Sequence, residues 1–78
     1  MREVTIVGVD VAKNVFQLHG AGSDGSVVFR KKLSRLQFAR FMAELPRCLV
    51  AMEACASAHH WAREMARHGH EVRLIVVP

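Results

Sequence analysis

The chain has 78 residues, enough for one domain, and 51% of them are hydrophobic with few glycines and prolines, which excludes a disordered chain. Eleven Lys and Arg residues against seven Asp and Glu residues give a formal net charge of +4, which favours a polyanionic partner such as nucleic acid. No apolar run approaches the roughly 20 residues of a membrane span, and the first residues have no signal-peptide pattern, so we expect a cytoplasmic protein with no membrane partner.

The first half of the chain predicts three antiparallel strands. Residues 4–9 are apolar and largely β-branched on both alternating faces, as in a strand that is buried on two sides. Short turns at residues 12–14 and 22–26 connect it through hairpins to strands at residues 15–20 and 27–33. The third strand carries three consecutive cations, which suit the edge of a sheet: Arg30, Lys31 and Lys32.

The second half predicts two helices that alternate with two strands. Ser34 and Gln37 fit a capping box, and the apolar side chains that follow recur at helical spacing until Pro46 ends the helix. The remaining elements are expected as a strand at residues 48–52, a helix from residue 58 to near residue 69, and a strand at residues 71–77.

This order, β-β-β-α-β-α-β, suggests an α/β fold with a mixed sheet of strand order 3-2-1-4-5, in which the first, fourth and fifth strands are parallel. Right-handed crossovers place both helices on the same face of the sheet. The fourth and fifth strands are apolar on both sides, so we expect an exposed hydrophobic patch on the opposite face. Such a patch predicts a homo-oligomer, or poor solubility when the chain is alone.

Two acidic residues end apolar strands that this topology makes neighbours. Asp10 follows the first strand and Glu53 the fourth, at the carboxyl ends where open α/β sheets bind ligands. Because carboxylates are costly to bury alone and two close ones repel, we expect a divalent cation between them. Oxygen ligands favour Mg²⁺ or Mn²⁺, which serve phosphoryl transfer. Two other roles stay open: Asp10 as the cap of the next turn, and Glu53 beside the second helix's amino terminus.

Four separated motifs occur in order along the chain: Gly8-Val9-Asp10-Val11-Ala12-Lys13-Asn14-Val15-Phe16, Met52-Glu53-Ala54-Cys55, His59-His60-Trp61-Ala62-Arg63 and Gly69-His70-Glu71-Val72. Together they resemble the amino-terminal part of insertion sequence 110 family transposases, and the resemblance covers essentially residues 1–78. That family consists of DNA recombinases with a RuvC-like, ribonuclease H-like domain bearing a DEDD acidic tetrad. By this resemblance, Asp10 is the first acid of the tetrad and Glu53 the second.

The resemblance implies DNA transposition by metal-dependent strand cleavage and transfer, with DNA and a guide RNA as partners of the full-length protein. In the family, the two later aspartates and a second domain with a serine nucleophile follow the region that this chain resembles. We therefore expect a ribonuclease H-like domain that is incomplete at its C-terminus and catalytically inactive alone.

Candidate nucleic-acid contacts are the four cations Lys13, Arg30, Lys31 and Lys32, of which the first lies next to the proposed metal edge. For the three strand cations, a solvated face is the alternative.

Four histidines in the last third of the chain invite a zinc hypothesis: His59, His60, His68 and His70. Adjacent histidines on a helix point to different faces, and no cysteine has zinc-ligand spacing, so solvent-facing or packing roles are favoured. A contact of His60 with metal or phosphate near Glu53 stays open. Cys48 and Cys55 flank a predicted strand that would hold them too far apart for a disulfide, so we expect two free buried thiols.

Two other functions stay open beside transposition. One is a non-catalytic remnant that binds nucleic acid or dimerises through the uncovered face. The other is half of an actin-like ATPase, which shares this kind of fold but needs a Gly- and Thr-rich phosphate turn after the first acid. The segment that follows Asp10, residues 11–14, offers no such turn.

Overall fold

A computed structural model describes residues 3–12, 14–55 and 57–76. Its elements are β1 (Ile6–Val11), β2 (Val15–Ala21), β3 (Val27–Ser34), α1 (Arg35–Glu44), β4 (Leu49–Glu53), α2 (Ala58–Arg67) and β5 (Glu71–Ile75), in the predicted order. The first strand begins and ends later than predicted, so that Asp10 lies inside β1 rather than after it. The last strand ends at Ile75, and the predicted end at Val77 falls outside the described residues.

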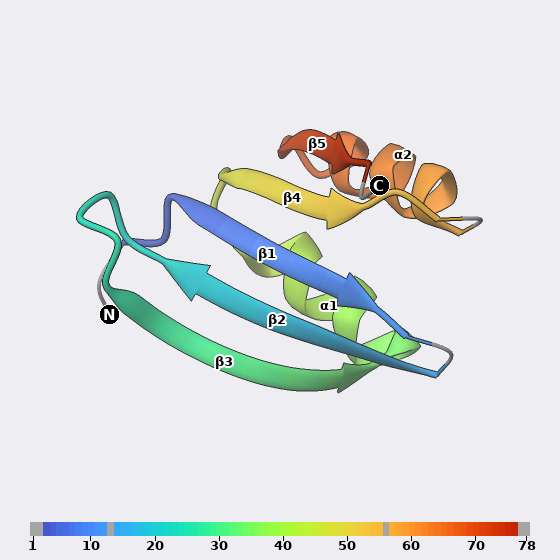
Figure 1. Ribbon diagram of the computed structural model, residues 1–78, viewed down its shortest axis with the longest axis horizontal. Coiled ribbons are helices and arrows are strands. Elements are labelled where there is room, and N and C mark those ends of the chain that lie inside the picture. Colours follow the sequence, from blue (N-terminus) through green and yellow to red (C-terminus); the bar gives the residue numbers. More distant parts are fainter. Residues whose placement is uncertain (1–2, 13, 56, 77–78) are drawn as a thin grey trace.

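The strands form one mixed sheet in the order β3-β2-β1-β4-β5, as predicted (Figure 1). β2 pairs antiparallel with β1 and with β3, as two consecutive hairpins require. β4 lies parallel to β1 and to β5, because helices make the crossovers that lead to these strands. The carboxyl ends of β1 and β4 therefore lie side by side.

Both helices pack on the same face of the sheet, as the handedness of the crossovers predicts (Figure 1). The rings of Phe16 in β2, Phe38 in α1 and Trp61 in α2 contact one another, with centroid separations of 4.4 to 5.2 Å. Met42 of α1 and Met65 of α2 are fully buried in the same core. This aromatic cluster holds the two helices against the centre of the sheet.

At the edge of the sheet, the ring of Phe29 fills the space of a missing side chain. Phe29 pairs with Gly20, and a Cβ atom on residue 20 would collide with that ring. The ring also packs edge to face on Phe41 of α1, with centroids 5.2 Å apart. Lys31 lies on the same side of β3, with its ammonium group 5.4 Å from the Phe41 ring centre. The helix-covered face thus extends to the edge strand.

Two local polar motifs define the ends of β3. The Asp24 carboxylate accepts hydrogen bonds from the Ser26 hydroxyl at 2.6 Å and the Ser26 N–H at 3.0 Å, and these bonds lower the pKa of Asp24. At the other end, the Ser34 hydroxyl accepts from the Gln37 N–H at 3.3 Å, and the Gln37 side chain accepts from the Ser34 N–H at 2.9 Å. This reciprocal pair confirms the predicted capping box and begins α1 at Arg35.

The face opposite the helices, called the open face, mixes apolar and charged side chains on β1, β4 and β5 and is polar on the central part of β2 and β3. Its apolar side chains on β1, β4 and β5 are Ile6, Leu49, Ala51 and Ile75, of which the last is 51% exposed. Its side chains on the central part of β2 and β3 are Gln17, His19, Arg30 and Lys32. The predicted hydrophobic patch is therefore limited to four side chains on β1, β4 and β5, which lie among the charged residues Asp10, Glu53, Glu71 and Arg73. Neither helix among the described residues has the length and apolar character needed to cross a membrane.

Candidate metal centre

Asp10 and Glu53 converge on one hollow, as the predicted strand order requires. β1 and β4 are in register through the pair Val9 and Met52, and each acid is the next residue along its strand. Since Val9 and Met52 face the helices, alternation places both acids on the open face. They line a hollow of about 310 Å³, called the acid hollow, together with Gly8, Val9, His19, Ala51 and Ile75.

Both acids are exposed, which corrects one premise of the sequence analysis. The expected need for a cation rested on burial of the carboxylates, but no described element covers this face of the sheet. Within residues 3–12, 14–55 and 57–76, neither the Asp10 carboxylate nor the Glu53 carboxylate has a hydrogen bond or an ion pair. A cation is favoured instead by the convergence of two like charges, because they lie on adjacent strands and neighbouring strands are about 4.8 Å apart.

Among the described residues, neither acid makes a capping hydrogen bond. Asp10 accepts no capping hydrogen bond in the turn after β1, of which Lys13 lies outside the described residues. Glu53 is the last residue of β4 and does not cap α2, whose N-cap Ser57 makes no side-chain capping bond. Both side chains remain available to a ligand.

The two carboxylates of the acid hollow suit a hard divalent cation, but they would supply only part of its coordination shell. Carboxylate oxygens are the ligands that Mg²⁺ and Mn²⁺ prefer. Among the described residues, no group of three or more His, Cys, Asp or Glu side chains is placed to hold a metal ion. Asp10 and Glu53 could thus supply two ligands, and water or a phosphate oxygen would complete the coordination.

Among the described residues, the histidines belong to no group of three or more possible metal ligands, and two of them have packing contacts. His70 is 4% exposed: its Nδ1 accepts the Cys48 N–H at 3.2 Å and its Nε2–H donates to the Met42 carbonyl at 2.8 Å. His60 contacts the Trp61 ring, with centroids 5.0 Å apart, and does not line the acid hollow.

His19 lines the acid hollow but was not among the predicted site residues. His19 lies in β2 opposite Gly8 of β1. Gly8 is two residues before Asp10 and therefore on the same face of the strand. The signal that identifies it is the hairpin register combined with period-two alternation. That register depends on where the turn begins, and the sequence pattern placed the end of β1 too early.

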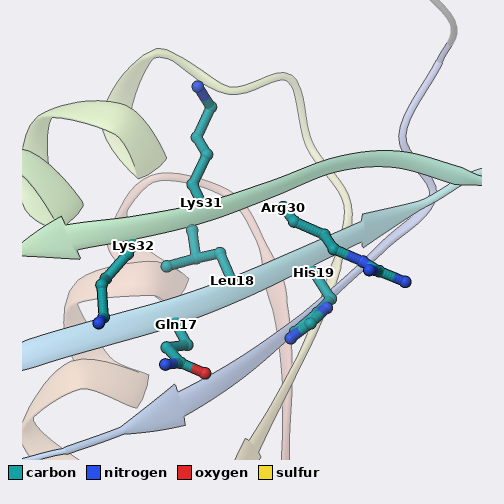
Figure 2. Close-up of a pocket in the computed structure, with 6 residues that line it drawn as sticks. All are labelled: Gln17, Leu18, His19, Arg30, Lys31 and Lys32. Carbon is teal, nitrogen blue, oxygen red and sulfur yellow. The ribbon is translucent and has the colours of Figure 1, made fainter.

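The predicted cluster of cations on β3 divides between the two faces of the sheet. Arg30 and Lys32 point to the open face and line a second hollow of about 230 Å³, called the basic hollow, together with Gln17, Leu18, His19 and Lys31. Figure 2 shows the Lys31 side chain pointing away from those of Arg30 and Lys32. The three cations therefore do not share one surface, because alternate residues of a strand face opposite ways. The fourth predicted contact, Lys13, lies outside the described residues.

The two cysteines are free thiols in different environments, so the expectation that both are buried was wrong for one of them. Cys48 is buried just before β4, and burial raises the pKa of its thiol. Cys55 is exposed, because it follows β4 in the link to α2 rather than lying within the strand.

Comparison with known proteins shows similarity to transposases of insertion sequences. No protein-family model matches the chain. It is 56% identical over 69 residues to the "probable family 20 transposase" of Pseudomonas aeruginosa, and 45% identical over 75 residues to the transposase for insertion sequence element IS1328 of Yersinia enterocolitica. It is 40% identical over 75 residues to the transposase for insertion sequence element IS1111A of Coxiella burnetii.

These alignments cover 88% of the chain in the first case and 96% in the other two. They cover 20%, 22% and 21% of the relatives, so the chain spans about a fifth of the length of the curated relatives it matches. The predicted resemblance to insertion-sequence transposases is confirmed at this level.

Proposed function

We propose that this chain is part of a transposase and serves DNA transposition, with Asp10 and Glu53 as two ligands of a divalent metal used in DNA strand cleavage and transfer. The observation that carries the proposal is the convergence of the two carboxylates on one hollow from adjacent parallel strands. The similarity to proteins named as transposases, over most of the chain, supports the same function independently.

The protein's own contribution at this hollow is orientation and access. The paired backbones of β1 and β4 hold the two acids at one level of the sheet. Gly8 and Ala51 precede the acids on the same face, and a Cβ atom on Gly8 would have no neighbour nearer than the His19 carbonyl oxygen at 4.0 Å. Small residues therefore leave room for a phosphodiester group. When bound, Mg²⁺ or Mn²⁺ would polarise a phosphoryl oxygen and activate the attacking hydroxyl group.

We infer further that the sheet is that of a RuvC-like, ribonuclease H-like domain with a DEDD tetrad. In support, the order β3-β2-β1-β4-β5 carries one acid on each of two adjacent parallel strands, where the resemblance puts the first two tetrad acids. The two further aspartates of such a tetrad would come from outside these 78 residues. Two carboxylates are too few for a metal pair, so we expect the chain alone to be catalytically silent.

For the full-length protein, we propose DNA and a guide RNA as partners, a homo-oligomeric assembly and a cytoplasmic location. The apolar side chains of the open face, of which Ile75 is 51% exposed, form a surface that assembly could bury.

Calorimetric titration with Mn²⁺ and Mg²⁺ tests the proposed metal ligands. We expect Asp10→Asn and Glu53→Gln each to weaken binding at least about tenfold, equivalent to about 1.4 kcal/mol, because each removes a charged ligand without changing side-chain size. Glu44→Gln is the matched control, since this exposed acid lies at the end of α1, away from the acid hollow. Equal binding by all four proteins would refute the metal assignment.

A non-catalytic remnant that binds nucleic acid is the second candidate, favoured by the small number of ligands. With only two carboxylates at the acid hollow, the chain could bind DNA without using a metal. The same titration separates these functions, because a remnant is indifferent to both acid substitutions. The actin-like ATPase alternative gains no support from the relatives, whose names describe transposases.

A further inference from the structure

Beside the Arg73–Glu71 pair of β5, the open face carries two strips of charge of opposite sign. The acid strip consists of Asp10 on β1 and Glu53 on β4. The basic strip consists of Arg30 and Lys32, two residues apart on β3. β2 lies between β1 and β3, so the strips are about 10 Å apart, two strand spacings of about 4.8 Å.

The basic strip is the uncompensated positive charge of this face among the described residues. On the opposite side of the acid hollow, Arg73 of β5 already pairs with Glu71, with 3.7 Å between Nη2 and Oε2. In the part of the chain that the structure describes, Arg30 and Lys32 have no ion-pair partner. An incoming polyanion would therefore meet unpaired cations on the β3 side.

His19 of β2 connects the two strips. It pairs with Gly8 on one side and with Arg30 on the other, and it lines both the acid hollow and the basic hollow. Its side chain is exposed and points to the same side of the sheet as Arg30 and Lys32 (Figure 2). An imidazole N–H at this position can donate a hydrogen bond to a group lying between the strips.

We propose that the backbone of a DNA strand crosses the open face from β3 toward β1, with phosphates on Arg30 and Lys32 and with His19 as the positioning residue that directs a neighbouring phosphate into the acid hollow. A separation of about 10 Å equals about three steps of the 3.4 Å axial rise per nucleotide of a duplex, so a few nucleotides of one strand are long enough to reach both strips. This strand path rests on the proposed function only for the role of Asp10 and Glu53 as metal ligands. The basic contacts can be tested without metal.

The alternation of β3 provides a control with the same charge on the same strand. Lys31 differs from Lys32 by one position, but its ammonium group lies over Phe41 on the helix-covered face. A strand path over the open face uses Lys32 and not Lys31. General attraction by net charge would treat the two lysines alike.

Fluorescence anisotropy of a short labelled DNA duplex, measured in EDTA over a range of salt concentrations, tests the path. Each lost phosphate contact should reduce the slope of log K against log salt by about 0.9. We expect this reduction, with weaker binding, for Arg30→Gln and Lys32→Gln, and no change of slope for Lys31→Gln. Equal losses for the two lysine variants, or a loss confined to Lys31→Gln, would overturn the proposal.

His19 is tested by rescue in the same assay. His19→Phe keeps a planar ring and removes the N–H donor, so we expect binding to weaken about threefold to tenfold. His19→Gln restores a donor and should recover most of the affinity, which a purely structural role would not predict. Thermal unfolding of both variants verifies that they fold. Unchanged binding by His19→Phe, or no recovery by His19→Gln in a folded protein, would contradict the positioning role.

The two proposals fail separately. If Asp10→Asn and Glu53→Gln leave Mn²⁺ binding intact, the metal assignment is wrong whatever the DNA slopes show. If metal binding responds but Lys31→Gln and Lys32→Gln behave alike in EDTA, the acid hollow stands and only the strand path is wrong.

Discussion

His70 and Cys48 form a buried polar contact between the starts of β4 and β5. The imidazole accepts the Cys48 N–H at Nδ1 and donates from Nε2 to the Met42 carbonyl, so both ring nitrogens have a hydrogen-bond partner. The Cys48 Sγ lies 3.6 Å from the same Nδ1. The contact ties α1 to the two parallel strands that extend the sheet beyond β1.

The two thiols should differ sharply in reactivity. The exposed Cys55 should be alkylated by iodoacetamide in the folded protein, whereas Cys48 should react only after unfolding, because burial raises its pKa and blocks access. Mass spectrometry of digested protein measures both sites, and Cys55→Ser is the control that leaves no reactive thiol. Rapid labelling of Cys48 under native conditions would contradict the packing described.

The raised pKa of Cys48 also makes the free energy of unfolding depend on pH. The folded state keeps the thiol proton above its ordinary pKa of 9.0, so this group's contribution is complete below that pH and is lost as pH rises through the folded-state pKa.

At the scale of elements, the capping box decides where β3 ends and α1 begins. We expect Ser34→Ala to lower the free energy of unfolding by about 1 kcal/mol, because it removes the acceptor of the Gln37 N–H. Ser34→Asp, which retains a capping acceptor, should lose much less. Denaturant unfolding measures both, with Ser23→Ala in the exposed β2–β3 turn as the control. A loss for Ser23→Ala as large as that for Ser34→Ala would argue against a specific cap.

The order of the elements and their topology followed from the sequence because each element carried its own local signal. Apolar periodicity, the Ser34 cap and the turn residues define strands and helices without long-range information. Crossover handedness then decided which face the helices cover, and neighbouring parallel strands brought Asp10 and Glu53 together.

What the sequence could not provide was register and sidedness. The hairpin registers decide that Arg30 and Lys32 lie on one face and Lys31 on the other. They also decide that His19 lies beside Gly8. One residue of displacement in a strand exchanges its two faces, so the pattern of residue types alone does not identify the neighbours of a charge.

At the scale of the whole molecule, packing and charge are separated by the sheet. The body measures 32 × 29 × 22 Å, with both helices and the aromatic cluster on one side and the two charged strips on the other. Substitutions of the open-face charges therefore remove no core contact. Ligand binding and folding can be examined separately in this chain.

The most direct measurement is Mn²⁺-induced broadening of the backbone amide NMR signals. If Asp10 and Glu53 hold the metal, the signals of Gly8, Asp10, Ala51 and Glu53 should broaden first, and the Asp10→Asn substitution should abolish the effect. Signals near the exposed acids Asp24 and Glu44, which lie away from the acid hollow, should stay sharp at the same Mn²⁺ concentration. Broadening centred on those acids, or unchanged by Asp10→Asn, would show that the two converging carboxylates do not form a metal site.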